Sequence, residues 1–187
     1  MKKVYLIHMW DGNSEENWYP WLKKELEKRN IKVITFDMPN SEHPKIEEWV
    51  KYLEEKIKNV DEETYFIGHS IGCQAILRFL EKLHKHKKIG GCIFVAGWFN
   101  LINLEPEEME IAHPWLNSKI DFLRILDHCN NFLAIFSDDD HYVPLSDSEI
   151  FRKDLYAKIV IEKKKGHFTE KTEPSILAET LKFLKIK

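Results

Sequence analysis

Hydrophobic residues along the chain form six short runs that alternate with longer segments of mixed polarity. The runs are rich in β-branched and aromatic side chains and end at polar residues or glycine, which is typical of β-strands. Because the runs are continuous rather than interrupted by polar residues, we expect a sheet that is covered on both faces. The six predicted strands cover residues 4–7, 31–36, 64–67, 92–96, 132–136 and 157–161.

The segments between these runs carry apolar residues at intervals of three and four, which predicts helices. One helix should follow Gly72 and extend to Leu83 and His84, and Pro174 should open the last one. Strands separated by helices indicate βαβ units with right-handed crossovers. We therefore predict an α/β fold, a single doubly wound domain over residues 1–187 with a mostly or wholly parallel sheet of six strands. The periodic residues are Trp18, Trp21, Leu22 and Leu26; Ile46, Trp49, Val50, Leu53 and Ile57; Leu77 and Leu80; and Leu177, Leu181 and Leu184.

Residues 97–116 are the least regular part of the sequence. They follow the fourth predicted strand and contain Trp98, Phe99 and Trp115. Ligands of open α/β sheets bind at the carboxyl ends of the strands, so this segment is a candidate wall of a substrate pocket. Aromatic side chains also anchor surface loops to a core, and the sequence leaves both interpretations open.

Composition narrows the class of protein without identifying its chemistry. The chain has 187 residues, 32% of them charged, with a net charge of −3, so no basic surface for nucleic acid or an acidic membrane is indicated. The three cysteines form no close pair in the sequence and fit a reducing compartment. Without a recognisable signal peptide or a run of membrane-spanning length, we expect a cytoplasmic protein.

The third predicted strand leads directly into Gly68-His69-Ser70-Ile71-Gly72. A strand, a Gly-x-Ser-x-Gly turn and a helix in this order are typical of the nucleophile elbow of serine hydrolases. The sharp turn strains the backbone of the serine and brings its neighbours close together, which favours glycine on both sides. The Ile71 amide then lies at a helix N-terminus, where it can stabilise an oxyanion. The same pentapeptide is also compatible with a turn whose serine only caps the helix.

Two further segments supply the partners that a nucleophilic serine needs. Asp138, Asp139 and Asp140 follow the fifth predicted strand, and His167 follows the sixth within Gly166-His167-Phe168. The order serine, acid, histidine is that of α/β-hydrolases, which favours Ser70 as nucleophile and His167 as general base. The three acids also fit a solvated or cation-binding loop, but they lack the alternate ligand spacing of a calcium loop. No histidines show metal-ligand spacing, so we expect neither a metal nor a cofactor.

The whole chain resembles the small serine hydrolases of the α/β-hydrolase superfamily that are grouped as retinoblastoma-binding-protein-9-like and YdeN-like. The resemblance implies a compact α/β-hydrolase fold with strand order 2-1-3-4-5-6, no large lid and a Ser-Asp-His triad. It also implies a carboxylester or amide substrate. Its marks are the segments 4–8 and 17–22, the pentapeptide at 68–72, the aspartate-rich loop 137–144 and Gly166-His167-Phe168.

The family pattern places the acid three residues before a Val-Pro or Leu-Pro pair, which selects Asp140 ahead of Val143-Pro144. Asp139 is the alternative, and Asp138 is assigned to the turn. By position, the amide of Trp10 would be the second oxyanion donor beside that of Ile71. Related enzymes have glycine where this chain has Met9, so the turn there is expected to differ in shape.

These observations predict a serine hydrolase that cleaves a small carboxylic ester, or a related thioester or amide, through an acyl-enzyme intermediate. Its partner would be a small acyl substrate, without nucleic acid or membrane, in a pocket that includes Met9, Trp98, Phe99 and Trp115. The alternative is a hydrolase fold with weak catalysis that binds another protein. Met9 and the tryptophan-rich segment keep that second interpretation open.

Overall fold

The six predicted strands form one fully parallel sheet in a computed structural model that describes residues 1–186. The order β2-β1-β3-β4-β5-β6 confirms the expected topology, and Lys187, the last residue of the expected domain, lies outside the described residues. Each strand pairs in register with its neighbours, so all six carboxyl ends lie at one edge. The strands are β1 (Lys3–Ile7), β2 (Lys32–Phe36), β3 (Thr64–His69), β4 (Gly91–Val95), β5 (Phe132–Ser137) and β6 (Lys158–Glu162).

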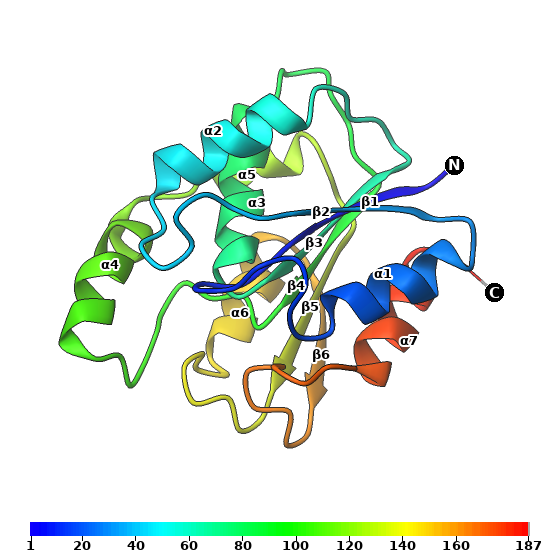
Figure 1. The fold of residues 1–187 in the computed structure, drawn as a ribbon. Helices are drawn as coiled ribbons and strands as arrows, with labels where there is room; N and C mark the ends of the chain where they lie inside the picture. Colours follow the sequence, from blue (N-terminus) through cyan, green and yellow to red (C-terminus); the bar gives the residue numbers. More distant parts are fainter. Residues whose placement is uncertain (187) are drawn as a thin grey trace.

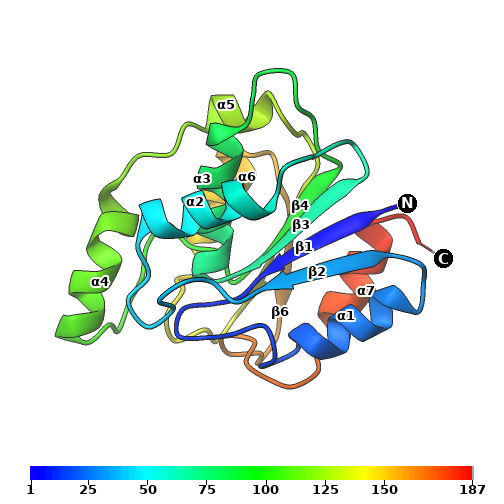
Figure 2. The same ribbon diagram turned by 45° about the horizontal axis from the view of Figure 1, so that its top comes forward.

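Helices cover both faces of the sheet, as a doubly wound fold requires. Figures 1 and 2 show α1 (Tyr19–Glu27) and α7 (Pro174–Phe183) on one face. The opposite face carries α2 (Ile46–Lys56), α3 (Ile71–Lys82), α5 (Phe122–Leu126) and α6 (Asp147–Asp154). Within residues 1–186, no helix combines the length and apolar character needed to cross a bilayer.

Helix α3 is the central element of the core. Ten of its twelve residues are buried, and it packs against β3, α2 and α5. The helix ends at Lys82 rather than continuing to His84 as predicted, because the backbone becomes extended at Leu83 (φ −62°, ψ 145°). Apolar periodicity did not show this end, because Leu83 still packs against the core outside the helix.

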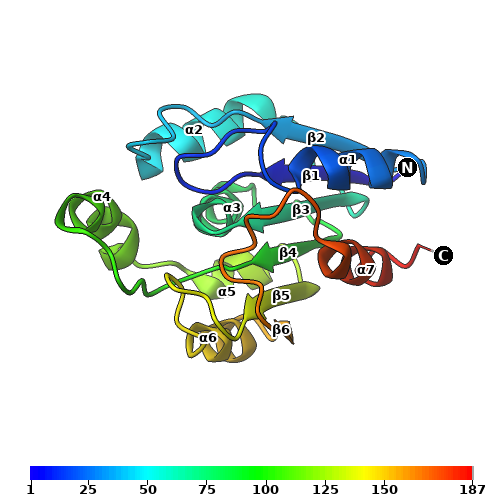
Figure 3. The same cartoon turned by 60° about the horizontal axis from the view of Figure 1, so that its bottom comes forward.

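The segment 97–116 contains a helix that the sequence pattern did not reveal. Helix α4 (Pro106–Asn117) begins with a proline in its first turn and a capping box between Glu105 and Glu108, both common helix starts. Pro114 interrupts its apolar pattern, which explains why periodicity missed it. Figure 3 shows α4 apart from the two helical layers, beyond the carboxyl ends of the strands.

The expectation of a sheet covered on both faces is correct for the central strands and wrong at the edge. Every residue of β3, β4 and β5 is buried, whereas no residue of β6 is fully buried and Ile161 is 48% exposed. An edge strand has a neighbour on one side only, and α6 and α7 do not cover β6 completely. A continuous apolar run therefore does not distinguish an edge strand from a central one.

The start of α3 is pressed against the end of β1. A Cβ atom on Gly72 would lie 2.5 Å from the Ile7 carbonyl oxygen and 2.8 Å from that of His8. A Cβ on Gly68 would lie 2.7 Å from the Cys73 nitrogen. These are backbone atoms of the sheet and of the helix start, so they have little freedom to move away. Glycine is therefore required on both sides of the turn between β3 and α3.

We predict that Gly72→Ala lowers the free energy of unfolding by about 3 kcal/mol or more, because its methyl group would overlap rigid backbone. Gly166→Ala is the matched control. Gly166 has φ +51° but open space around its Cβ position, so the cost should be about 1 kcal/mol of backbone strain. Urea denaturation measures both values. An equal decrease in the free energy of unfolding of the two variants would show that the close contact at Gly72 does not limit the size of the side chain there.

Candidate active site

Ser70 occupies a strained turn between β3 and α3. Its φ of 54° and ψ of −120° lie in a region that residues with a side chain rarely adopt. Its backbone N–H donates to the Val95 carbonyl at 2.9 Å, which ties the turn to the end of β4. The side chain is 6% exposed and lies at the floor of a cavity. The strained turn thus presents the hydroxyl at the carboxyl edge of the sheet.

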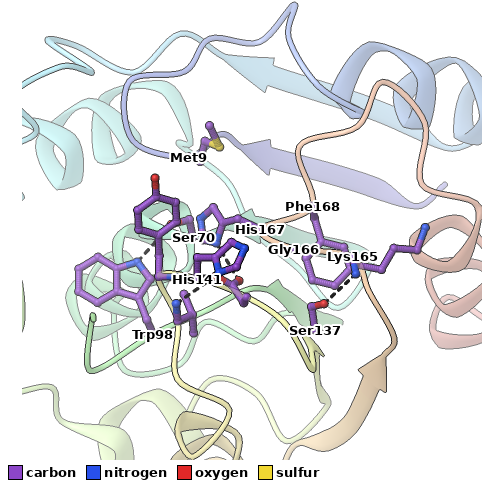
Figure 4. A network of polar contacts seen from close by, with 12 residues as sticks. Met9, Ser70, Trp98, Ser137, His141, Lys165, Gly166, His167 and Phe168 are labelled. Atoms are coloured by element: carbon purple, nitrogen blue, oxygen red, sulfur yellow. Dashed lines mark hydrogen bonds and ion pairs between the residues drawn. The ribbon is translucent and has the colours of Figure 1, made fainter. Parts of the chain in front are cut away.

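Two side chains flank the Ser70 hydroxyl. The indole Nε1–H of Trp98 donates to Ser70 Oγ at 3.2 Å, and the His167 imidazole lies on the other side (Figure 4). Within residues 1–186, no direct hydrogen bond joins Oγ to His167. Such contacts are often long in free enzymes and tighten when substrate binds. Sequence reasoning expected Trp98 in the pocket wall but missed its bond to Ser70.

His167 is held by one of the three consecutive aspartates. Asp140 Oδ2 accepts a hydrogen bond from His167 Nδ1–H at 2.8 Å. Asp140 Oδ1 accepts from the N–H groups of Tyr142 and Val143 at 2.9 and 3.0 Å, and this carboxyl side chain is only 2% exposed. With Nδ1 as the donor, the imidazole leaves Nε2 free to accept a proton. Both residues follow the ends of neighbouring strands, β5 and β6.

The other two aspartates bind backbone of the loop that carries His167. Asp138 accepts from the Lys164 N–H, and Asp139 accepts from the Gly166 N–H, each at 2.8 Å. Asp139 also accepts from the Ser137 hydroxyl at 2.7 Å, and this bond is the main reason that its pKa is lowered. All three acids therefore hold the 164–167 loop, but Asp140 alone reaches the imidazole among the described residues.

The turn after β1 lies beside the start of α3. Within residues 1–186, the backbone N–H groups of Trp10 and Ile71 have no acceptor, whereas the Met9 N–H donates to Tyr19 Oη at 3.2 Å. Met9 keeps a negative φ, and the left-handed residue of this turn is Asp11 at 52°. The turn therefore does not need a left-handed conformation at Met9, the position where the family resemblance led us to expect glycine.

A fully buried histidine connects the loops around Ser70. His69 Nε2–H donates to the His167 carbonyl at 2.8 Å, so Nδ1 accepts the hydrogen bond from the Tyr19 hydroxyl at 2.6 Å. Burial, followed by the nearby His167, holds the pKa of His69 well below its ordinary value. The ring is therefore neutral with a fixed tautomer. Through Tyr19 and Met9, this network joins the β1 turn to the histidine loop.

The cavity above Ser70 has a volume of about 490 Å³ and an apolar interior with an acidic rim. No lysine or arginine lines it within the part of the chain that the structure describes. Its apolar and aromatic lining is Met9, Trp10, Trp98, Leu101, Leu104, Ile111 and Tyr142. Its polar lining is Asp11, Glu42, His43, Ser70, Glu105, Glu107, Glu108 and His167.

Two residues that we expected in the pocket wall lie elsewhere. Phe99 packs against Phe122 and Phe151, with ring centroids 5.5 and 4.9 Å away, and does not line the cavity. Trp115 is 1% exposed and its indole N–H donates to the Pro44 carbonyl at 2.9 Å beneath α4. Both therefore anchor the 97–116 segment, whereas Trp98, Leu101 and Leu104 supply its pocket wall.

Metal ligands are not assembled around this cavity. Among residues 1–186, no three histidine, cysteine, aspartate or glutamate side chains are grouped closely enough to hold a metal ion. The three cysteines are buried and free.

The sequence and the structure both match known proteins over nearly the whole chain. YdeN of Bacillus subtilis (strain 168) is 33% identical over 169 residues, which cover 90% of this chain and 87% of YdeN. The crystal structure of the B. subtilis ydeN gene product superposes with a TM-score of 0.89 at 29% identity, covering 99% and 100% of the two chains. Serine hydrolase RBBP9 of Rattus norvegicus is 26% identical over 154 residues, which cover 81% and 77% of the two chains.

A more distant solved structure shares the fold. Est1E of Butyrivibrio proteoclasticus with bound ferulic acid has a TM-score of 0.76 at 16% identity, over 99% of this chain and 88% of Est1E. The sequence profile of the serine hydrolase family matches residues 4–185. With its six parallel strands in the order 2-1-3-4-5-6 and Ser70 at the turn after β3, the chain belongs to the serine hydrolase family and has the α/β-hydrolase fold.

Proposed function

We propose that this serine hydrolase cleaves small carboxylic esters through a Ser70-His167-Asp140 triad and an acyl-enzyme intermediate. The observation that carries the proposal is the hydrogen bond between Asp140 and His167 Nδ1, which turns the free Nε2 to the cavity that holds Ser70. A general base with a fixed tautomer beside a serine on a strained turn is the arrangement that acyl transfer requires.

In the first step, Ser70 Oγ attacks the carbonyl carbon of the ester while its proton passes to His167 Nε2. The carbonyl oxygen becomes an oxyanion, which the N–H groups of Ile71 and Trp10 stabilise because they have no other acceptor. When the intermediate collapses, the bond to the alcohol breaks and His167 returns the proton to the leaving oxygen. Asp140 stabilises the imidazolium that exists between these two transfers.

In the second step, water attacks the acyl group on Ser70 and gives its proton to His167 Nε2. Collapse of this second intermediate releases the acid, and the proton returns from His167 to Ser70 Oγ. The apolar interior formed by Leu101, Leu104 and Ile111 supports an apolar acyl group, because burying it there removes hydrocarbon from water.

The charge at the cavity mouth favours some leaving groups over others. Glu105 and Glu108 are engaged in the capping box of α4. Glu107 is 83% exposed and lies 3.9 Å from His43 Nε2, whereas Glu42 has no cationic partner among the described residues. With no lysine or arginine in the lining, this rim repels anionic leaving groups such as coenzyme A. The rim therefore supports neutral or cationic esters and thioesters as substrates.

Ser70→Ala and His167→Ala should each lower turnover of short p-nitrophenyl esters by about 10⁴-fold, because the triad acts as a unit. Reaction with a fluorophosphonate probe, followed by mass spectrometry, checks that the modified residue is Ser70. A folded wild-type protein that neither reacts with the probe nor hydrolyses these esters would contradict the proposal and favour a protein-binding role.

Asp140→Asn should lower kcat by about 10⁴-fold, because asparagine holds His167 in the wrong tautomer and no longer stabilises the imidazolium. Asp139→Asn is the matched control with the same loss of charge. Its Oδ1 can still accept from Ser137 and Gly166, so kcat should fall by less than about fivefold. Steady-state kinetics on one p-nitrophenyl ester compares the two. A larger loss at Asp139 than at Asp140 would reverse the assignment of the acid.

Butyrylthiocholine should be hydrolysed with a kcat/KM about tenfold higher than butyryl-coenzyme A at low ionic strength, since the acyl groups are the same and the leaving thiols differ in charge. Added salt should reduce this preference. The double variant Glu42→Gln/Glu107→Gln should also reduce it, whereas Glu54→Gln/Glu55→Gln, on α2 outside the cavity, should not. An unchanged preference in the first variant would show that the rim does not select by charge. Release of the thiol measures every rate.

A further inference from the structure

The side chain of Trp98 is placed against the oxygen that the proposed reaction uses. Its indole Nε1 lies 3.2 Å from Ser70 Oγ, and both side chains are almost fully buried, at 1% and 6% exposure. Indole is a donor without an acceptor, so Ser70 Oγ must accept in this bond. The hydroxyl proton is then free to point to another group. His167 lies on the opposite side of Oγ from the indole, as Figure 4 shows.

The backbone around Trp98 is fixed on both sides. The Trp98 carbonyl accepts from Gln74 Nε2 at 2.7 Å, and Gln74 belongs to α3, the helix that begins immediately after Ser70. The next two backbone N–H groups, of Phe99 and Asn100, donate to the buried Asp147 carboxylate at 2.6 and 2.8 Å. These hydrogen bonds fix the backbone of Trp98 against α3, the same helix that positions Ser70.

The chain adopts an unfavourable conformation to reach this position. Ala96, directly after β4, has a φ of 46°, in the left-handed region that costs residues with a Cβ atom about 1–2 kcal/mol. Gly97 follows, and a Cβ there would lie 2.7 Å from the Phe151 ring. Backbone strain of this kind concentrates at functional sites, where surrounding contacts stabilise it. Here the strained turn directs Trp98 to Ser70.

We propose that Trp98 is a further catalytic residue: its indole N–H holds Ser70 Oγ, directs the hydroxyl proton to His167, and stabilises the negative charge that Oγ carries as the proton leaves. The inference rests on the proposed function. In acylation, the O–H bond breaks, the proton goes to His167 Nε2, and Oγ forms the bond to the acyl carbon. In deacylation that bond breaks, Oγ takes the electron pair, and the proton returns from His167.

The hydrogen bond from the indole N–H becomes stronger as the negative charge on Ser70 Oγ increases. In the acyl-enzyme, Oγ is an ester oxygen and a poor acceptor, so the bond from Trp98 weakens there. It strengthens again as Oγ becomes the leaving group in deacylation. Hydrogen bonds to charged groups contribute more than those between neutral groups, so Trp98 should matter in both chemical steps.

Trp98→Phe tests the proposal because it removes the N–H and keeps an aromatic ring in the wall. We expect kcat for p-nitrophenyl esters, and the rate of fluorophosphonate labelling of Ser70, to fall about 10- to 100-fold. Trp115→Phe is the matched control, since Trp115 is equally buried and also donates its indole N–H, but to the Pro44 carbonyl outside the cavity. Its kcat and labelling rate should stay close to those of the wild type.

A series of acetate, butyrate and hexanoate esters separates the hydrogen bond from a role in shaping the pocket. Loss of the N–H should lower kcat by a similar factor for all three acyl groups. A change confined to KM that grows with acyl length would show that Trp98 only shapes the pocket and would overturn the proposal. Labelling of Trp98→Phe at the wild-type rate would overturn it as well. A wild-type protein that is neither labelled nor active would refute the proposed function itself, and this inference with it.

Nuclear magnetic resonance of the indole N–H groups keeps the proposal testable where Trp98→Phe does not fold. Wild-type protein is compared with Ser70→Ala, which removes the acceptor oxygen. We expect one slowly exchanging indole proton to shift upfield and the remaining indole signals to stay in place. Unchanged signals from all the tryptophans would overturn the proposal.

Discussion

The close approach of the first turn of α3 to the end of β1 is the constraint on which the rest of the site depends. It is possible because Gly72 has no side chain where a Cβ would meet the carbonyl oxygens of Ile7 and His8. The same turn forces Ser70 to a φ of 54°, a conformation that the buried helix behind it stabilises. The packing of α3 against β1 thus stabilises the strained backbone at Ser70 without a bound ligand.

A buried network of hydrogen bonds around His69 fixes the positions of the loops next to this turn. His69 is the neighbour of Ser70 and reaches both Tyr19 and the backbone of His167. Tyr19 in turn holds the backbone of Met9, so the turn after β1 and the loop after β6 share one set of contacts. Both nitrogens of the His69 ring are paired, as the full burial of this side chain requires. The network explains how loops from distant parts of the sequence keep a common geometry.

The strands were predicted well from the sequence because each is marked by a short apolar run of neighbouring residues. Six apolar runs fell on the six strands, and the order of the parallel sheet was expected from the resemblance to the family. Helix α4 was missed because Pro114 breaks its pattern, and the exposure of β6 was missed because an edge strand and a central strand look alike in composition. Phe99 and Trp115 were placed in the pocket because aromatic residues serve equally in walls and anchors.

The strands, the glycines that the turn at Ser70 needs, and the candidates for nucleophile, base and acid could all be identified from the sequence alone. The family resemblance favoured Asp140 among three adjacent carboxylates, and the folded chain shows that Asp140 is the one that reaches His167, while Asp138 and Asp139 bind backbone of the 164–167 loop. Only the tertiary structure decided that Trp98 contacts Ser70 while Trp115 does not. Hydrogen bonds depend on directions in space, and residues 26 or more positions apart acquire those directions only when the sheet brings their strands together.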